Sequence, residues 1–377
     1  MTPTEIEIIK LTSTREHIKS IFLPIVNDNN PYIKQLIDNL KNVGIELVLP
    51  ETSSSRTFFL STVIFPQKAN IVHLQWLHPF FVRSKNQFIN IIKFLIIISE
   101  LIILKLIGIK IIWTVHNIKN HENKYLILDR IYSITVARLA NAIIAHCQIA
   151  KEEIIKEFSL KNTDKIFVVP HGNYIDCYEN KIEKGTARKT LGLEDSSLVF
   201  LFLGTIRPYK GVFELIDTFN KLYSDKSDNI QLVIAGRVYN DSQEITDTLK
   251  EKIANDPRIK FFPGFVPDDE VQVYMNACDV VIFPYRDILT SGAVILAMSF
   301  GRACIAPRKG CIGEVLDDQG AFLYQIDDEN GLTKAMNSAL EKQHELLLMG
   351  QHNFELAQYY NWGYIAKMTA DVYHHCL

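Results

Sequence analysis

The sequence lacks the patterns that mark metal sites and disulfide frameworks. Its six cysteines include no CxxC pair and no zinc-like spacing; they stand at positions 147, 177, 278, 304, 311 and 376. No DxD triplet ends a predicted strand, and the paired acids in PDDE, LDDQ and IDDEN fall in polar turns. We therefore expect reduced cysteines and a protein that requires no metal.

Strong charge of either sign is also missing. The formal net charge is −3, and no long lysine or arginine block is present, which argues against nucleic acid as a partner. The first residues, MTPTEIEIIKLTSTREH, have neither the basic start nor the apolar core of a secretory signal. We expect a cytoplasmic protein whose anion sites are local.

Only one long apolar run is present, NIIKFLIIISELIILKLIG, at residues 90–108. Lys93, Glu100 and Lys105 interrupt it, so a membrane-spanning helix is not expected. Two interpretations remain open: a helix packed under a sheet, or a helix that lies partly in a membrane interface next to the basic segment RSKNQ.

What the sequence does contain is an alternation of strands and helices, made twice. In a chain of 377 residues with 47% hydrophobic residues, this pattern predicts two doubly wound parallel-sheet domains. The polar segment at 176–195 is the expected linker. Before it we expect strands at 5–11, 45–50, 70–76, 109–117, 142–146 and 165–172, with helices at 32–44, 90–108, 124–141 and 150–158. After it we expect strands at 198–204, 230–236, 258–264, 279–285 and 302–307, with helices at 212–223, 268–278 and 291–300.

The stretch LFLGTIRPYKGV places two cations after a buried strand. Gly204 ends the strand and Gly211 starts the next helix, while Arg207 and Lys210 project from the turn. Ligands of doubly wound sheets bind at the carboxyl ends of the strands, where exposed helix amides also attract anions. The stretch predicts a phosphate site; the alternative is a pair of solvated loop cations.

A second anion cradle is expected in PYRDILTSGAVILAM. Thr290 or Ser291 can cap a helix there, and Gly292 permits close approach of a diphosphate to the backbone. An ordinary capped helix is the alternative for this segment alone. Taken with the first cradle, it indicates one diphosphate site shared by two strand ends.

In this order, GTIRPYKG, LVIAGR, FFPGFVPDDEVQVYMNACDVVIFPY, SGAVILAMSFGRACIAP and GCIGEVL resemble the donor-binding half of family 4 retaining glycosyltransferases. NIVHLQW, WTVHN and VPHGNY resemble the acceptor half, and YNWGYIAKMTADVY resembles the final helix that crosses back. The resemblance implies a GT-B fold of two facing Rossmann-like domains. It places the acceptor domain at 1–180, with 358–377 crossing back to it, and the donor domain at 181–357.

The resemblance also implies roles for individual residues. Lys210, and less firmly Arg207, would stabilise the departing diphosphate of a nucleotide sugar, and His116 would face the donor sugar. Gly204 ends the strand at this site, and Ser291 and Gly292 begin the helix. The turn Gly264, Phe265 and Val266 would bind the base, and Glu314 would meet the sugar or the ribose.

Two departures from the family pattern affect these roles. Thr205 stands where members often carry an arginine, so Arg207 is only three residues before the lysine. Ile288 and Leu296 stand where many members carry two glutamates. Asp287 would replace part of the missing sugar contact. His73, His121 and His171 are weaker cleft candidates in the first half, with structural roles as the alternative.

The expected activity is metal-independent transfer of a hexose from a UDP- or GDP-linked sugar to a glycan or polyprenyl-linked glycan, with retention of configuration. This would serve cell-surface or exopolysaccharide synthesis, at the inner face of the plasma membrane if the apolar helix contacts anionic lipid. No cofactor is expected besides the donor. The alternative is an inactive nucleotide-sugar-binding subunit; a phosphorylase or an epimerase of the same fold fits less well.

Overall fold

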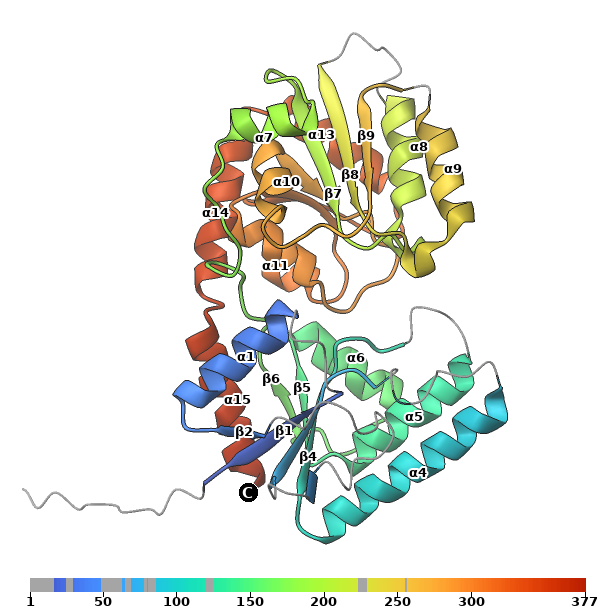
Figure 1. The fold of residues 1–377 in the computed structure, drawn as a ribbon, viewed down its shortest axis with the longest axis vertical. Coiled ribbons are helices and arrows are strands. Elements are labelled where there is room, and N and C mark those ends of the chain that lie inside the picture. Colours follow the sequence, from blue (N-terminus) through green and yellow to red (C-terminus); the bar gives the residue numbers. More distant parts are fainter. Residues whose placement is uncertain are drawn as a thin grey trace, which may run out of the picture.

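The computed structural model describes residues 17–24, 30–48, 63–64, 69–77, 80, 86–119, 125–222, 229–254 and 256–377. The strand expected at 5–11 and the candidate His121 lie outside these residues, as do Arg83 and Lys85 of the RSKNQ segment. Two α/β units stack along the long axis, and the last two helices run beside both of them (Figure 1).

The first unit is built on a parallel sheet whose strand order is β2-β1-β3-β4-β5-β6. Its first strand was not anticipated from the sequence, and the other five match expected strands. Most strand residues are buried because helices cover both faces. The strands are β1 (Lys19–Leu23), β2 (Glu46–Val48), β3 (Ile71–Leu74), β4 (Lys110–Thr114), β5 (Ala142–Ala145) and β6 (Ile166–Val168).

Alternate strand residues pack against different helices of this unit. Ile112 joins the core under α1 (Pro31–Asn42) and α15 (Trp362–Cys376). Its neighbours Ile111 and Trp113 join the core on the other face, with three further helices. Those helices are α4 (Gln87–Leu106), α5 (Leu126–Leu139) and α6 (Gln148–Phe158).

The second unit repeats the arrangement with the strand order β12-β11-β10-β7-β8-β9, again all parallel. Its strands are β7 (Leu198–Leu203), β8 (Ile230–Gly236), β9 (Ile259–Pro263), β10 (Val280–Ile282), β11 (Ala303–Pro307) and β12 (Ala321–Tyr324). Its helices are α7 (Lys184–Leu191), α8 (Val212–Leu222), α9 (Gln243–Ile253), α10 (Val271–Ala277), α11 (Gly292–Ser299), α12 (Ile312–Val315), α13 (Gly331–Glu341) and α14 (Leu346–Gln358). The fold predicted from the alternation is confirmed.

The C-terminal helix crosses back to the first unit, as expected. α14 packs on the second sheet, and α15 lies against α1 of the first (Figure 1). The Tyr373 hydroxyl lies 2.6 Å from Nδ1 of His73, and Nε2 of His73 lies 2.7 Å from the Thr114 hydroxyl. His73 therefore fastens α15 to the sheet, which is the structural alternative for this residue.

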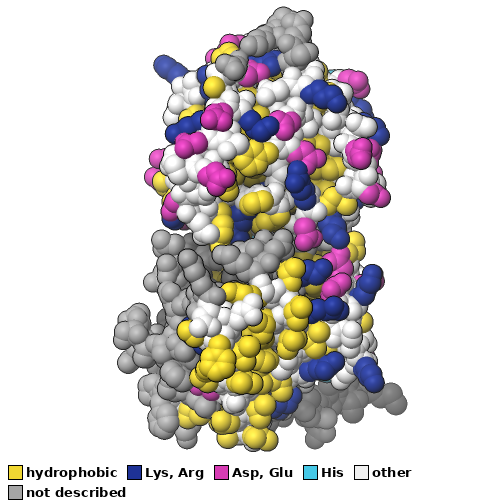
Figure 2. Space-filling view, turned by 90° about the vertical axis from the view of Figure 1, so that its right-hand side faces the viewer, with side chains coloured by type: hydrophobic (Ala, Val, Ile, Leu, Met, Phe, Trp, Pro, Cys, Tyr) yellow, Lys and Arg dark blue, Asp and Glu magenta, His cyan; other side chains and the backbone are white. Residues whose placement is uncertain are grey.

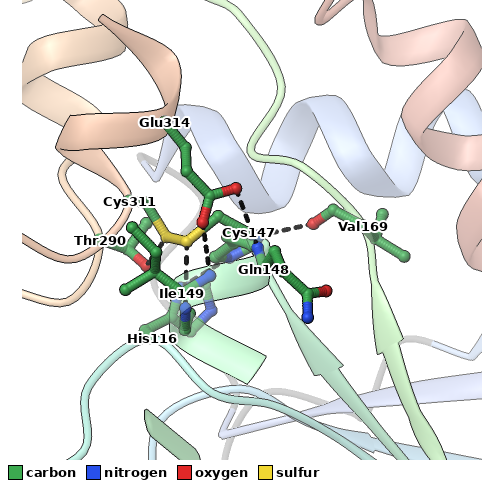
Figure 3. The surroundings of a disulfide bond; sticks show 10 residues. His116, Cys147, Gln148, Ile149, Val169, Thr290, Cys311 and Glu314 are labelled. Atoms are coloured by element: carbon green, nitrogen blue, oxygen red, sulfur yellow. Dashed lines mark hydrogen bonds between the residues drawn. A yellow bond between two sulfur atoms is a disulfide. The ribbon is translucent and has the colours of Figure 1, made fainter. Parts of the chain in front are cut away.

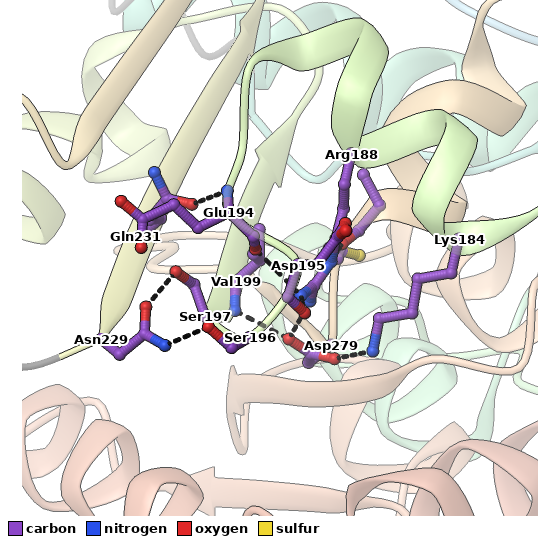
Figure 4. Close-up of polar contacts among 12 residues, drawn as sticks. Lys184, Arg188, Glu194, Asp195, Ser196, Ser197, Val199, Asn229, Gln231 and Asp279 are labelled. Atoms are coloured by element: carbon purple, nitrogen blue, oxygen red, sulfur yellow. Dashed lines mark hydrogen bonds and ion pairs between the residues drawn. The ribbon is translucent and has the colours of Figure 1, made fainter.

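The segment predicted as a linker contains α7, which packs on α10. Arg188 on α7 is only 2% exposed; its guanidinium donates to the carboxylate of Asp279 at 2.8 Å and to the Ala277 carbonyl at 3.0 Å (Figure 4). The same Asp279 carboxylate accepts from the amide of Val199 at the start of β7. The helix was missed because its buried anchor is a charged residue, which a pattern of apolar residues does not reveal.

The expectation that all cysteines are reduced is wrong for one pair. Cys147, which precedes α6, and Cys311, which precedes α12, form a disulfide between the two units, with Cα atoms 5.5 Å apart. The two residues are 164 positions apart, so local spacing could not reveal the pair. Cys177, Cys278, Cys304 and Cys376 are free.

Candidate functional site

The turn after β7 is held tightly against the end of β10. It consists of Gly204, the short helix η1 (Pro208–Lys210) and Gly211. Gly211 has φ +67°, and a Cβ there would overlap the Pro284 carbonyl, so a larger residue would displace the turn. The sequence therefore brings Lys210 to the carboxyl ends of two neighbouring strands, β7 and β10.

Arg207 and Lys210 are half-buried and rest on aromatic rings. The Arg207 guanidinium lies 4.0 Å from the ring centre of Tyr239, and Nζ of Lys210 lies 5.7 Å from that of Tyr285. Within the described part of the chain, neither cation forms a salt bridge. Burial, and then repulsion from Arg207, lower the pKa of Lys210 to about 8. Two neighbouring cations without a carboxylate partner favour an anionic ligand.

The start of α11 completes the anion cradle. Ser291 is the cap, and its hydroxyl accepts from the Val294 amide at 3.4 Å. Gly292, at the first turn, faces the first unit: a Cβ there would lie 3.0 Å from the Tyr174 hydroxyl and 3.4 Å from Nε2 of His171. The helix start therefore packs closely against Tyr174 and His171 of the first unit.

Three buried histidines, His116, His146 and His171, lie just beyond the carboxyl ends of β4, β5 and β6. His146 donates its Nδ1 proton to the Val169 carbonyl at 2.9 Å, because a carbonyl oxygen can only accept. Burial lowers the pKa of His146 to about 4, so the ring is neutral and its Nε2 accepts. Nδ1 of His116 lies 3.3 Å from that nitrogen and is the donor (Figure 3). His146 therefore orients the ring of His116 through its Nδ1.

The other side of His116 is also packed. Trp76 stacks on the ring with a centroid distance of 4.5 Å, and Oε1 of Gln75 lies 2.8 Å from Nε2 of His116. Nε2 of Gln75 is buried and has no hydrogen-bond partner among the described residues. A half-turn of the Gln75 amide would exchange its Oε1 and Nε2 and place this unpaired donor against Nε2 of His116. These contacts fix the ring plane at the end of β4.

His171 is the second histidine that reaches the cleft. Its Nδ1 donates to the Gly172 carbonyl at 2.7 Å, which leaves Nε2 turned toward Gly292. Burial, and then His146, lower the pKa of His171 to about 3. This ring is neutral at physiological pH and presents a hydrogen-bond acceptor to the start of α11.

Glu314 bridges the two units. Its carboxylate accepts from the backbone amides of Gln148, at 3.1 Å, and Ile149, in the first turn of α6 (Figure 3). A carboxylate at this end of a helix satisfies free amides and complements the helix dipole. The adjacent Cys147–Cys311 disulfide joins the same two elements. In this conformation, Glu314 contacts the first unit.

Asp287 lines a cavity of about 210 Å³ between the units. The cavity is bounded by Asn117 and Lys119 after β4, by α6, and by Lys309, which forms an interunit ion pair with Glu153 at 3.7 Å. Asp287 is exposed and can contact a ligand there. In the described residues, no group of three or more histidine, cysteine or acidic side chains is placed to hold a metal ion.

The predicted base-binding turn follows β9. Gly264 has φ +133°, Phe265 is 74% exposed, and Val266 packs against the second unit's core. An exposed aromatic ring at a strand end offers a face on which a base can stack.

Sequence reasoning missed several residues around the predicted ones. His146 ends the expected strand AIIAH, so its place at a strand end was the available signal. Tyr32, from α1, packs edge-on against His116 at 5.2 Å and tilts against His171 at 4.8 Å. No local pattern marks Tyr32, because the contact joins residues far apart in the chain.

The comparisons with known proteins agree with this geometry. The family model described as group 1 glycosyl transferases matches residues 197–342. GDP-mannose:glycolipid 4-beta-D-mannosyltransferase of Xanthomonas campestris pv. campestris is 27% identical over 313 residues, which cover 82% of this chain and 79% of that protein. D-inositol 3-phosphate glycosyltransferase of Corynebacterium glutamicum is 24% identical over 216 residues, 56% of this chain and 51% of that protein.

Solved structures show the same fold. The Anabaena protein HepE, in complex with UDP and glucose, superposes with a TM-score of 0.73 at 17% identity, covering 95% of this chain and 100% of that chain. Sucrose-phosphate synthase from Thermosynechococcus elongatus gives a TM-score of 0.74 at 14% identity, covering 96% and 99%. The fold is GT-B. Within it, residues 197–342 match the group 1 glycosyl transferase model.

Proposed function

We propose that this protein moves a hexose from a UDP- or GDP-linked sugar to a hydroxyl of a glycan or lipid-linked glycan, with retention of configuration. The observation that carries the proposal is the pair Arg207 and Lys210, which lie half-buried in the turn after β7 without a salt bridge among the described residues. A diphosphate between β7 and α11 would supply the missing negative charge.

The chemistry of the step follows from this placement. As the bond from the anomeric carbon to the diphosphate breaks, negative charge develops on the departing oxygen, and Lys210 and the α11 amides stabilise it. In a front-side displacement, the departing phosphate takes the acceptor proton, so no separate base is needed. His116 and Asp287 would hold the sugar, and Phe265 in the turn Gly264–Val266 would stack on the base.

The same proposal assigns the acceptor and donor sites to separate domains and gives Glu314 a contact with the donor. The acceptor site belongs to residues 1–180 with 358–377, and the donor site belongs to 181–357. For Glu314 to reach the sugar or ribose, its carboxylate must leave the amides of α6 when the donor binds. The interunit contact and the donor contact are therefore mutually exclusive.

A donor panel tests the proposal. Thermal unfolding is measured with UDP- and GDP-linked hexoses, because a donor that binds only the folded state raises the melting temperature. The stabilising donor, labelled in the sugar, is then incubated with lipid-linked glycan extract. Stabilisation followed by transfer supports the proposal. Binding without turnover supports the inactive subunit that Ile288 and Leu296 in place of two glutamates would produce.

The configuration and the metal requirement need separate measurements. The related mannosyltransferase forms a beta linkage according to its name. An alpha product from an alpha-linked donor, seen by NMR, supports retention; a beta product overturns retention and leaves the transfer intact. We expect activity to survive excess chelator because the cations and helix amides replace a metal. Loss of activity with rescue by magnesium or manganese contradicts that.

A further inference from the structure

The first unit carries an apolar surface that its fold does not cover. α4 buries Ile97, Leu101 and Leu104 against the sheet, which confirms the packed interpretation for one face of the helix. Its opposite face stays open: Phe88 is 68% exposed and Leu106 is 80% exposed. No described helix is long and apolar enough to cross a membrane.

The exposed surface extends over the neighbouring helix. α5 packs beside α4, with Phe94 stacked on Tyr132 at 4.2 Å. Figure 2 shows the resulting apolar field over the lower unit. We call this field the α4–α5 face; its exposed apolar side chains are Phe88, Ile89, Ile91, Ile92, Leu95, Ile102, Ile103, Leu106, Leu126, Ile127 and Ile131. Monomeric proteins rarely leave contiguous apolar surface of this extent without a partner.

The charges of the two helices have one sign at the surface. Their acidic side chains, Glu100 and Asp129, are 5% and 8% exposed and point inward. The exposed charged residues of the two helices are all cationic: Lys105, Arg130 and Arg138. An apolar field whose own two helices expose only cations complements a surface with anionic groups above a hydrocarbon layer.

We propose that the α4–α5 face docks the enzyme on an anionic lipid bilayer, lying in the interface without crossing it. A second copy of the chain fits less well because a two-fold contact through this face would bring its cations together. The face belongs to the unit that carries His116. Resting on the proposed function, docking would hold the acceptor half of the cleft close to a glycan whose lipid tail stays in the bilayer.

Vesicle sedimentation tests the proposal without any need for turnover. The full chain is mixed with vesicles of phosphatidylcholine alone or with added phosphatidylglycerol, at low and high salt. We expect pelleting with the anionic vesicles at low salt, and less at high salt because the ions screen the cations. Absence of pelleting with anionic vesicles at low salt overturns the proposal.

Matched variants locate the contact. Phe88→Ser, Leu95→Ser and Leu106→Ser together should lower the vesicle partition coefficient at least about tenfold, since they remove the inserted side chains. Leu347→Ser with Leu348→Ser is the control: these residues, 81% and 68% exposed on α14, lie in the other unit. Equal pelleting of the two variants overturns the proposal, provided both show the unfolding profile of the parent chain.

The charge contribution has its own pair of variants. Arg130→Glu with Arg138→Glu should reduce pelleting with anionic vesicles, whereas Lys250→Glu, an exposed lysine on α9, should not. Sedimentation velocity without lipid tests whether a second copy of the chain covers the face instead. A dimer that the triple serine variant abolishes, together with no vesicle binding by the parent chain, overturns the lipid assignment. Transfer to a short water-soluble acceptor reports separately on the proposed activity.

Discussion

At the scale of single residues, burial lowers the pKa of two basic side chains of the site, Lys210 and His146. Lys210 loses part of its hydration in the turn after β7 and is repelled by Arg207, and both effects destabilise its charged form. A bound anion would offset this destabilisation. His146 is neutral because burial opposes its protonation, and its one proton points to Val169. The proposed ligand contacts of Lys210 and His116 thus depend on their neighbours Arg207 and His146.

Nucleoside diphosphate binding should weaken as the pH rises through about 8, the lowered pKa of Lys210. Below this pH the lysine is charged and attracts the diphosphate; above it, binding must first supply a proton. Calorimetric titration with UDP and GDP near pH 7 and about two pH units higher measures the change. Lys210→Arg should remove the pH dependence, and Lys210→Ala should bind weakly at both. Parallel curves for the parent and Lys210→Ala would remove Lys210 from the site.

His146→Leu should lower kcat about 10- to 100-fold, because His116 loses the acceptor that orients its ring. The KM for the donor should change less, since the proposed diphosphate contacts lie in the other unit. A positioning role also predicts a shifted pH–rate profile, because Nδ1 of His116 loses its acceptor. A variant that folds normally and keeps the parent kcat would show that the contact between His116 and His146 is only structural.

At the scale of elements, the anion cradle depends on close backbone packing between the turn after β7 and β10. The turn approaches Pro284 so closely that only glycine fits at position 211. α7 shows a comparable dependence, because one buried arginine ties it to α10 and to the strand that leads into the site. Local geometry in both places is set by the neighbouring element.

Gly211→Ala should lower the free energy of unfolding by about 2–4 kcal/mol, because its Cβ would overlap the Pro284 carbonyl at a positive φ. Gly192→Ala is the matched control: its φ of +65° is similar, but nothing lies within 4 Å of the added atom. The control should lose only about 1–2 kcal/mol, the cost of the left-handed backbone. Equal losses in urea unfolding would mean that the close approach to β10 contributes nothing.

At the scale of the whole molecule, several side-chain contacts between described residues join the two units across the cleft. They include the Cys147–Cys311 disulfide, the Glu314 carboxylate on α6, and the ion pair of Lys309 with Glu153. α15 adds a second connection on the opposite side of the first sheet. The width of the cleft therefore depends on side chains from both units as well as on the chain that links them.

Peptide mapping without reductant should recover a linked peptide containing Cys147 and Cys311. Cys311→Ser should lower the free energy of unfolding by about 2–4 kcal/mol, since the bridge closes a long loop in the unfolded chain. Cys376→Ser removes a free, partly buried thiol and serves as the control. Six reactive thiols in the denatured, unreduced protein would contradict the disulfide.

The alternation of apolar strands and amphipathic helices predicted every described strand except β1 and β12, because burial on two faces leaves a continuous apolar run in the strand. The sequence also predicted the candidate anion-site residues, because strand ends, turns and caps are set by residues that are neighbours in the chain. These residues are Arg207, Lys210, Ser291 and Gly292. The structure confirms their places in the turn after β7 and at the cap of α11, and their roles toward a ligand stay predictions.

Other features were decided only by the tertiary structure. The contact of Glu314 with Gln148 joins residues 166 positions apart, and that of His73 with Tyr373 joins residues 300 apart. From the sequence alone, Arg188 is expected at the surface; the structure buries it in an ion pair with Asp279. The sequence determined which segments bury apolar surface, since this depends on local periodicity. The hydrogen-bond partners of polar groups across the cleft depend on how the two units pack against each other. A local sequence pattern does not contain that information.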